Sequence, residues 1–397
     1  MGAMINYVKL ADCCEKITDY VASGSFASLK ANVLVTNQPN YAIMVKTADF
    51  SNGFTKGLTY TDKHGYEFLS NSNLFGGELI LSNIGSIGKV FIVPNLHCPM
   101  TLASNSIMVK PNKDFSVKYL YYLFSSKYGY NTLLSISSGT SMKKFNKTML
   151  KEVLIQLRTS EEQHRIVHEL DDINLAIENK KQVFSSLDEL VKSRFIEMFG
   201  DPVANPFSFE KVSLGEIANI KIGPFGSLLH REDYVENGHP LINPSHIINE
   251  KIVSDKNLTI SDKKYEELNA YSLNIGDVVL GRRGEMGRCA VVCEEGLLCG
   301  TGSLIISTKG ELSSAFIQKC ISFPTFKKMI EDYAVGQTML NLNVSIVSKF
   351  PITKPPKSLQ IAYNAFVKLI DKSKFIVQQQ IKDLQELLDS KMDEYFR

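Results

Sequence analysis

Two stretches of the chain place apolar residues alternately three and four positions apart. This spacing is typical of a helix that buries one face against another helix. It predicts one long helix from about Ser160 to Met198 and a second from about Ser358 to Phe396. Ser160 and Gln163 have the spacing of a capping box at the start of the first helix, and Gly200 is suited to end it.

The apolar seam of each helix predicts how the two helices associate. Because neither stripe would be stable in water, the simplest partner of each helix is the other, and we expect an antiparallel coiled coil. Lys180 and Lys374 fall on seam positions, where a polar group either fixes the register or extends outward to water. The seam positions are Ile166, Leu170, Ile173, Ile177, Lys180, Phe184, Leu187, Val191, Arg194 and Met198, followed by Tyr363, Val367, Ile370, Lys374, Val377, Ile381, Leu384, Leu388, Lys391 and Tyr395.

The rest of the chain has short apolar runs separated by Gly, Asn, Ser and Pro, a pattern that indicates strands and turns. Glu78–Ser82 and Val278–Gly281 are two such predicted strands. Helical stretches are also expected at Val117–Tyr130 and Ser314–Tyr333. The fold class predicted from these elements is α+β.

The chain also repeats itself once, at a spacing of about 200 residues. Five motifs recur in the same order, and their offsets differ by only two residues, which a chance match would not produce. The matched pairs are Gly24-Ser25-Phe26-Ala27-Ser28-Leu29 with Gly223-Pro224-Phe225-Gly226-Ser227-Leu228, Gly77-Glu78-Leu79-Ile80-Leu81 with Gly276-Asp277-Val278-Val279-Leu280, Gly85-Ser86-Ile87-Gly88-Lys89 with Gly284-Glu285-Met286-Gly287-Arg288, Gly139-Thr140-Ser141-Met142 with Gly336-Gln337-Thr338-Met339, and Phe199 with Phe396.

The repeat and the two helices together predict the domain organisation. We expect globular domains at 1–159 and 201–356, each followed by a long helix, at 160–200 and 357–397. The two similar mixed α/β domains would be separated by the antiparallel helices, with an internal pseudo-two-fold axis. At ~1.5 Å per residue, a helix of about 38 residues spans roughly 57 Å.

Composition adds little, but the distribution of charge is informative. The formal net charge is +2, and it divides into +7 for residues 1–159, −4 for 160–200, −2 for 201–356 and +1 for 357–397. A basic first domain is compatible with nucleic acid, whereas any such contact in the second domain requires a local cluster. The seven irregularly spaced cysteines predict reduced thiols in a cytoplasmic protein. The sequence has no long apolar run and no signal-peptide pattern, so no membrane segment is expected.

Motifs for catalysis and cofactor binding are not found. The spacing of Gly281, Gly284 and Gly287 does not fit a dinucleotide or S-adenosylmethionine loop. Asn205-Pro206-Phe207 is superficially similar to an adenine methyltransferase motif, but it lacks the second proline and stands in a linker. We therefore expect no catalytic residue, no metal site and no cofactor in this chain. Three nearby cysteines are predicted to be buried free thiols rather than metal ligands, namely Cys289, Cys293 and Cys299.

The ordered motifs resemble the specificity subunit of type I restriction–modification systems over essentially the whole chain. The turn at Gly223–Ser227 resembles the opening of the family's target-recognition domain. The segment Ala270–Arg288 resembles its central core, and Val335–Asn341 its late glycine turn. The helices Ser160–Gly200 and Ser358–Arg397 resemble the two spacer regions of the family. The first repeat departs from the pattern, with Ser25 and Ala27 replacing Pro224 and Gly226, and Lys143-Lys144-Phe145 replacing Leu340-Asn341-Leu342.

The resemblance implies a non-catalytic subunit that binds double-stranded DNA. Each domain would read one half of a split site, and the predicted helices exceed the ~34 Å between turns of B-DNA. The implied partners are two methyltransferase subunits and further restriction and translocase subunits. Those partners would methylate adenine N6 with S-adenosylmethionine, use ATP and Mg²⁺, and cut unmethylated DNA.

Contact with DNA requires donors to phosphates for affinity and contacts to base edges for specificity. Arginines among glycines in the second repeat and lysines beside hydroxyls in the first are the sharpest clusters, although each could equally be a solvated surface. Tyr265 and Tyr271 could contact bases, but are more typical of core or surface aromatics. The candidate DNA-binding residues are Lys30, Lys89, Thr140, Lys143, Lys144, Lys147, Lys221, Ser227, His230, Arg231, Arg282, Arg283 and Arg288, with Ser138 and Ser141 nearby.

Two other functions remain open from the residues alone. The chain could be a coiled-coil scaffold that never touches DNA, or a methyltransferase or nuclease that acts by itself. The second would require a cofactor or metal motif. The outward helix faces are a candidate docking surface for methyltransferase or simply a solvated acidic face, and their acidic residues include Glu161, Glu162, Asp171 and Asp172.

Overall fold

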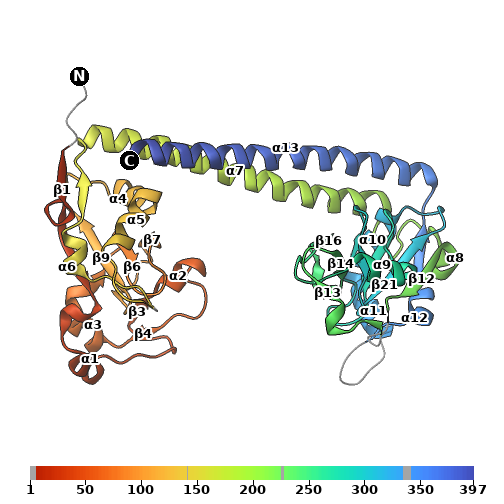
Figure 1. Ribbon diagram of the computed structural model, residues 1–397, viewed down its shortest axis with the longest axis horizontal. Helices are drawn as coiled ribbons and strands as arrows, with labels where there is room; N and C mark the ends of the chain where they lie inside the picture. The colour runs from red at the N-terminus through yellow and green to blue at the C-terminus, as the bar shows by residue number, and fades with distance from the viewer. Residues whose placement is uncertain (1–5, 141, 225–227, 334–340) are drawn as a thin grey trace. The chain divides into compact units, whose positions relative to one another are not determined.

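The computed structural model describes residues 6–140, 142–224, 228–333 and 341–397. It divides into two compact units, each containing sheets and helices, as the α+β prediction requires (Figure 1). Unit 1 comprises Met1–Val183 and Val377–Arg397, and unit 2 comprises Phe184–Ile376. Each unit therefore includes part of both long helices.

The two long helices form as predicted. Helix α7 extends over Ser160–Phe199 and helix α13 over Lys357–Tyr395. The predicted cap of the first helix is wrong by one residue, because the capping box is formed by Thr159 and Glu162. The Thr159 amide donates to Glu162 (2.9 Å), and the Glu162 amide donates to the Thr159 hydroxyl (3.2 Å). Gln163 is buried instead, where its side chain accepts from the Ser116 amide (2.8 Å).

Unit 1 is built on two four-stranded sheets within its described residues. The first is antiparallel and has the order β2 (Cys14–Asp19), β9 (Ser106–Pro111), β6 (Leu79–Ser82), β7 (Val90–Ile92). The second has the order β4 (Tyr60–Thr61), β3 (Ala42–Val45), β8 (Met100–Leu102), β5 (Asn73–Leu74), with β3 and β8 parallel. Strand β1 (Tyr7–Lys9) pairs with β10 (Leu154–Gln156). The helices are α1 (Phe26–Asn32), α2 (Thr47–Ser51), α3 (Lys63–Phe68), α4 (Val117–Ser125), α5 (Lys127–Ser135) and α6 (Lys147–Lys151), with short 3₁₀ turns at Leu10–Cys13, Tyr20–Ser23 and Ser70–Ser72.

Unit 2 repeats this plan. Its antiparallel sheet has the order β12 (Ala218–Ile222), β21 (Ser303–Thr308), β18 (Val278–Gly281), β19 (Cys289–Val291). The second sheet has the order β13 (Tyr234–Val235), β17 (Thr259–Ile260), β14 (His239–Ile242), β20 (Leu298–Cys299), with β14 and β20 parallel. Strand β11 (Glu210–Ser213) pairs with β22 (Pro351–Lys354), and β15 (Ile247–Ile248) with β16 (Lys251–Ile252). The helices are α8 (Leu214–Ile217), α9 (Asp262–Glu267), α10 (Ser314–Ser322), α11 (Pro324–Tyr333) and α12 (Val344–Ser348), with 3₁₀ turns at Arg231–Asp233, Pro244–His246 and Asn269–Tyr271.

Two helices that the sequence predicts as continuous are each broken in two. In unit 1, Ser126 adopts an extended conformation between α4 and α5, and its hydroxyl caps α5 by accepting from the Gly129 amide (3.0 Å). In unit 2, Phe323 is extended and Pro324 begins α11. Proline has no amide hydrogen to continue a helix, whereas it is well tolerated at a helix start.

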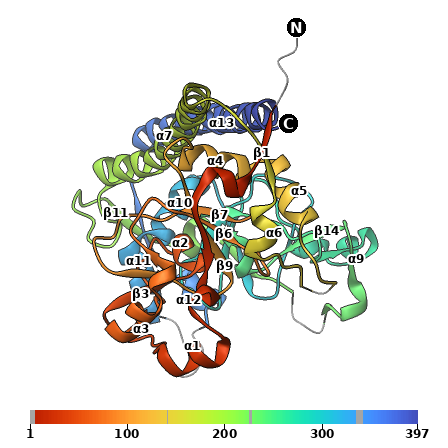
Figure 2. The ribbon, with the colours of Figure 1, turned by 90° about the vertical axis from the view of Figure 1, so that its left-hand side faces the viewer.

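One inner strand of the antiparallel sheet, β6 in unit 1 and β18 in unit 2, is buried on both faces; it is called the central strand below. In unit 1, Leu79 and Leu81 pack toward the helices, and Ile80 packs toward the second sheet. In unit 2, Val278 and Val279 divide in the same way. Figures 1 and 2 show α4 between the long helices and this sheet in unit 1. Each unit is therefore layered as helices, antiparallel sheet and mixed sheet.

In unit 1, the start of α7 and the end of α13 pack together on α4. Phe396 lies against the buried Tyr119 ring, with 5.5 Å between centroids. Glu169 accepts from Lys391 (3.1 Å) and from the Tyr395 hydroxyl. The prediction that Asp171 lies on an outward face is wrong, because its carboxylate accepts from Tyr122 (2.7 Å) of α4.

In unit 2, the end of α7 packs against the start of α13. Phe199 contacts Phe316 and Tyr363, with centroid distances of 4.9 and 5.3 Å. Lys374 is buried in the seam, where it pairs with Asp188 and lies 4.7 Å from the Phe184 ring. The antiparallel packing predicted for the helices is thus present in each unit, and Lys374 takes the register-fixing position rather than the outward one.

The apolar positions assigned to the seam are buried or half-buried throughout. The buried ones are Ile166, Leu170, Ile173, Ile177, Val191, Ile370, Val377 and Ile381, and the half-buried ones are Leu187, Val367, Leu384 and Leu388. Lys180 is half-buried.

All seven cysteines lie in the described residues and are free. Cys289 and Cys299 are buried as predicted, but Cys293 is exposed, because it follows the end of strand β19. Among the described residues, no helix has both the length and the apolar character needed to cross a membrane.

Replacing Phe199 with alanine is expected to lower the free energy of unfolding by about 3–5 kcal/mol, because the lost ring leaves a cavity between α7, α10 and α13. Urea unfolding of the full chain measures this difference. Phe375 is the matched control, since it is 73% exposed on α13 and its replacement with alanine should change little. Equal losses for the two variants would contradict the packing described.

Glu169→Gln is expected to destabilise the chain at neutral pH, and this effect should shrink as the pH falls below the usual carboxyl range. Hydrogen bonds from Tyr395 and Lys391 lower the pKa of Glu169. A lowered carboxyl pKa adds stability above the unfolded-state pKa, and this stability is lost as pH falls through the folded pKa. Urea midpoints across the acidic range test this. Glu178→Gln, which removes only an exposed pair with Lys181, is the control. A gap between wild type and Glu169→Gln that stays constant with pH would rule out the assigned contacts.

Candidate functional site

Three segments meet beside the end of β6 in unit 1: the end of β6, the turn before β9, and the residues around Lys144. The Asn83 amide donates to the Asn105 carbonyl (3.3 Å), and the Phe145 amide donates to the Asn83 carbonyl (3.2 Å). The Asn83 side chain also donates to the Phe145 carbonyl (2.9 Å). These bonds hold the three segments side by side.

Unit 2 holds the corresponding segments in the same way. The Arg282 amide donates to the Gly302 carbonyl (2.9 Å), and the Leu342 amide donates to the Arg282 carbonyl (2.9 Å). The Arg282 guanidinium also donates through Nε to the Asn341 side chain (3.1 Å). The backbone arrangement is therefore repeated, whereas the side chains it carries are different.

The hairpin loops after β6 in unit 1 and β18 in unit 2 depend on glycines with positive φ. Gly88 and Gly287 have φ of 88° and 73°, in conformations that other residues rarely adopt. A Cβ at Gly88 would lie 2.2 Å from the Tyr130 ring, and one at Gly287 would lie 2.5 Å from the Lys327 side chain. These two glycines are thus required by turn geometry and by packing on α5 and α11.

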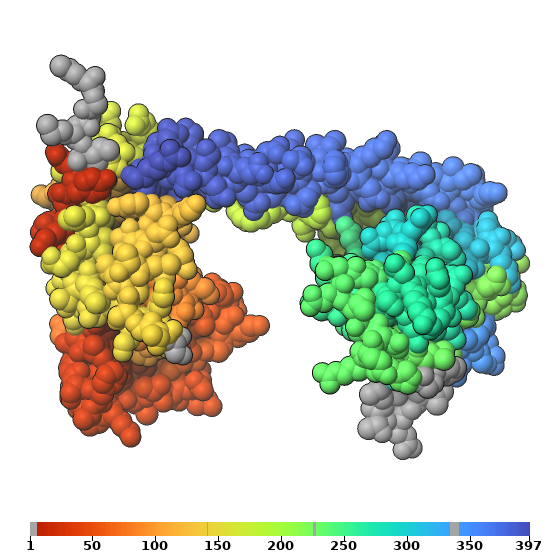
Figure 3. Space-filling model, in the orientation of Figure 1, coloured from red at the N-terminus to blue at the C-terminus, as the bar shows by residue number. Residues whose placement is uncertain are grey.

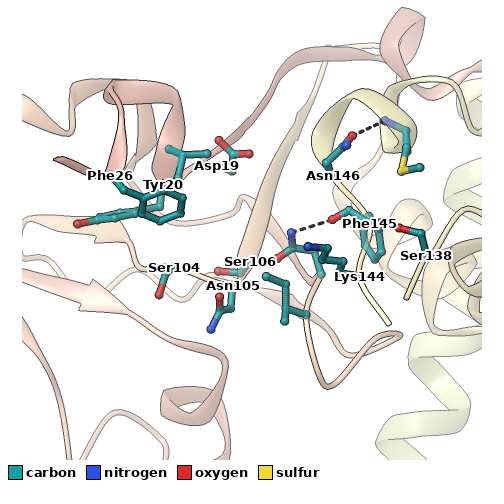
Figure 4. Close-up of a pocket in the computed structure, with 14 residues that line it drawn as sticks. Asp19, Tyr20, Phe26, Ser104, Asn105, Ser106, Ser138, Lys144, Phe145 and Asn146 are labelled. Atoms are coloured by element: carbon teal, nitrogen blue, oxygen red, sulfur yellow. Dashed lines mark hydrogen bonds between the residues drawn. The ribbon is translucent and has the colours of Figure 1, made fainter. Parts of the chain in front are cut away.

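A cavity of about 340 Å³ opens beside the three segments of unit 1 (Figure 4). Phe26 and Tyr20 line one side of it, and Lys144 and Phe145 line the other. Asn105 also lines the cavity, from the turn before β9. The Phe26 ring is 76% exposed. An aromatic ring, an amide and an ammonium at one opening can provide stacking, hydrogen bonding and charge.

The predicted basic residues of unit 1 only partly converge on this site. Lys144 lines the cavity and is bridged through its backbone to Ile84 and Ser138. Lys143 and Thr140 are exposed beside it, and the region from α5 to α6 lies at the surface in the space-filling view (Figure 3). Lys147 is half-buried and forms an ion pair with Asp19 (2.9 Å).

The remaining predicted residues of unit 1 lie on other segments. Lys89 is exposed near the end of the loop between β6 and β7, and Lys30 is exposed in the last turn of α1. Ser138 lines the cavity, and Ser141 lies outside the described residues.

The arginine cluster predicted in unit 2 divides into two parts. Arg282 and Arg283 stand at the end of β18, and Arg283 is exposed. Arg288 forms an ion pair with Glu285 (2.6 Å) and donates to the Pro244 carbonyl (3.2 Å), so its guanidinium supports the hairpin loop. Lys327 pairs with the same Glu285 (3.1 Å).

Charges at this end of β18 shift the pKa values of neighbouring groups. Hydrogen bonds from Arg288 and Lys327 lower the pKa of Glu285. Burial, and secondarily the charge of Arg283, lowers the pKa of Arg282. The charge of Arg283 thus adds to the effect of burial in destabilising the charged form of Arg282.

The other predicted residues of unit 2 are dispersed. Lys221 donates to the Ala270 carbonyl and lies 4.7 Å from the Tyr271 ring. His230 and Arg231 are exposed at the start of a 3₁₀ turn, whose cap is formed by Asp233. Tyr265 stacks on His239, with 3.9 Å between ring centroids. Ser227 lies outside the described residues.

The sequence did not single out Asn83, Asn105 or Phe26 as site residues. Asn105 has a φ of 69°, which places an exposed amide in a left-handed turn. A comparison of the two repeats would have marked this position, because Asn105 corresponds to Gly302. Phe26 offered no such signal, since an aromatic residue in an amphipathic helix usually joins the core.

The chain is similar to known proteins over most of its length. A family model described as "Type I restriction modification DNA specificity domain" matches residues 6–186 and 206–387. The MjaIX specificity subunit of a Methanocaldococcus jannaschii type I restriction enzyme is 25% identical over 336 residues, covering 79% of this chain and 75% of that protein. The MjaVIII specificity subunit from the same organism is 23% identical over 287 residues, covering 67% of each chain.

Solved structures share the fold. The S subunit of a type I restriction–modification system from M. genitalium aligns with a TM-score of 0.51 at 16% identity, covering 100% of this chain and 98% of that one. A chain from a structure that describes complex assembly and conformational transition of the type I R-M system aligns with a TM-score of 0.63 at 17% identity, covering 99% and 97%.

Asn83→Ala is expected to loosen the segment around Lys144, because the Phe145 carbonyl would lose its side-chain donor. An unsatisfied buried acceptor costs about 1–3 kcal/mol, so the local opening should become easier. Hydrogen–deuterium exchange measures this directly at the amides of Lys144 and Phe145. Asn131→Ala, at an exposed position of α5, should leave those amides unchanged. Unaltered exchange in Asn83→Ala would remove the basis for a fixed three-segment site.

Proposed function

Since this chain belongs to the type I restriction modification DNA specificity family, we propose that it reads a bipartite DNA site and brings methyltransferase and restriction subunits to that site. The observation that carries the proposal is the duplicated three-segment site. Both units hold the same backbone frame through equivalent hydrogen bonds, but they display different side chains on it. Such a pair of sites is suited to two half-sites of different sequence.

The proposed division of labour follows the repeat. Residues 1–159 and 201–356 act as the two target-recognition domains, and residues 160–200 and 357–397 act as spacer helices. This assignment is supported by the helices α7 and α13, which begin and end close to those limits. The bonds that attach Gln163 to the Ser116 segment link the spacer to the first recognition domain.

The side chains best placed to meet DNA are the exposed ones at the three-segment sites. In unit 1 these are Thr140, Lys143 and Lys144, and in unit 2 they include Arg283, with the half-buried Arg282 next to it. Lysines and hydroxyls suit phosphates, whereas arginine can also pair with base edges.

The remaining predicted residues have lesser roles in the proposal. Outlying phosphate contacts are proposed at Lys30, Lys89, His230 and Arg231, and a further donor at Ser227. Lys147, Lys221 and Arg288 would act chiefly by holding the surfaces in place, since each already has an internal partner.

In this proposal the chain contributes recognition and its partners contribute chemistry. Two methyltransferase subunits would transfer a methyl group from S-adenosylmethionine to adenine N6, and restriction subunits would use ATP and Mg²⁺. The outward helix faces, including Glu161 and Asp172, are the proposed docking surface for the methyltransferase subunits. These two carboxylates are exposed on α7.

Exchanging residues 201–356 for the corresponding segment of a related subunit is expected to change one half of the methylated motif and leave the other half intact. Sequencing of N6-methyladenine in cells with and without the gene measures the motif. A methylome without a bipartite motif that depends on this gene would refute the proposal. So would duplex binding by the assembled complex that is absent or insensitive to salt, because phosphate contacts release counterions.

A further inference from the structure

The two three-segment sites differ at one structurally equivalent position in a way that bears on which bases are read. Ile84 and Arg283 each follow the last residue of the central strand by the same number of positions. Both form an isolated antiparallel bridge to the third segment of their site: Ile84 pairs with Lys144, and Arg283 pairs with Asn341. The backbone thus presents the two side chains from the same place in each unit. One side chain is aliphatic and half-buried, and the other is an exposed cation.

The turn before β9 in unit 1 and the turn before β21 in unit 2 differ in the opposite sense. In unit 1, Asn105 is exposed and lines the 340 Å³ cavity, so its amide group is presented beside Ile84. In unit 2 the equivalent residue is Gly302, which has no side chain. A Cβ at Gly302 would lie 3.0 Å from the Pro244 ring, so a larger residue there would require that ring to shift by a few tenths of an ångström. The polar group therefore comes from the turn in unit 1 and from the end of the strand in unit 2.

These side chains have distinct preferences among base edges. Arginine pairs with both acceptors of guanine, O6 and N7. Asparagine pairs with adenine through N6 and N7, and an aliphatic group can contact the methyl group of thymine. Arg282 is the less accessible of the two arginines, because it is half-buried and its Nε donates to Asn341 (3.1 Å).

Building on the proposed function, we infer that the two half-sites are distinguished by base type at one equivalent position: unit 2 recognises a guanine through Arg283, and unit 1 recognises an A·T pair through Asn105 with Ile84 against thymine. The lysines of unit 1, Lys143 and Lys144, then act on phosphates. The alternative for Arg283 is a phosphate contact, which would strengthen binding to every sequence equally.

The test is selection of duplexes from a randomised library by the complex of this chain with its methyltransferase subunits. For Arg283→Ala, we expect one position of the half-site assigned to residues 201–356 to lose its guanine preference by about tenfold or more. For Asn105→Ala, we expect one A·T position in the other half-site to relax. Lys328→Ala and Asn131→Ala, exposed on α11 and α5, are the matched controls and should leave both half-sites unchanged.

Each outcome of the selection decides the inference. A uniform loss of affinity in Arg283→Ala with an unchanged consensus would assign that guanidinium to phosphate and overturn the inference for unit 2. An unchanged consensus in Asn105→Ala would overturn it for unit 1, provided that hydrogen exchange shows a folded variant. A wild-type complex that enriches no sequence would refute the proposed function itself. The selection therefore separates failure of the base assignment from failure of DNA recognition.

Discussion

Burial of the long-helix seams against the globular parts is the constraint on which the rest of each unit depends. In unit 2, Phe199 from the end of α7 and Tyr363 from the start of α13 share one aromatic cluster with Phe316. In unit 1, Phe396, which directly follows α13, packs on Tyr119. Each globular part is therefore attached to both helices rather than only to the helix that follows it. Loss of either contact would expose aromatic surface and free the antiparallel sheet from its helical layer.

The repeat is a repeat of backbone geometry more than of side chains. The buried acids Glu78 and Asp277 both accept backbone amides at the turn before the central strand. The glycines of the hairpin loops have matching positive φ values. Such positions are constrained by turn conformation and close contact, whereas exposed residues on the same frame are not. A duplicated frame can therefore present Ile84 in one unit and Arg283 in the other without any change of fold.

The sequence predicts those features that depend on periodicity or on turn chemistry. The long helices and the duplication were recognisable because their residues recur at fixed intervals, and the strand at Val278–Gly281 because it is an apolar run between turn residues. The breaks at Ser126 and Pro324 were missed, since the apolar pattern continues across both. Asp171 was misassigned because its partner Tyr122 is 49 positions away in the sequence. Contacts of this kind depend on the tertiary fold, which local patterns do not encode.

The candidate site shows the same limit, because charge alone does not distinguish binding groups from structural ones. Residues 1–159 carry a net charge of +7, whereas residues 201–356 carry −2. In unit 2, Glu285 engages both Arg288 and Lys327, so these two cations beside β18 already have an internal partner. Non-specific attraction grows with the number of phosphates neutralised, while discrimination between bases depends on side-chain geometry. On the proposed function, residues 1–159 are therefore better suited to salt-dependent attraction, and residues 201–356 would obtain more of their binding from well-positioned hydrogen bonds.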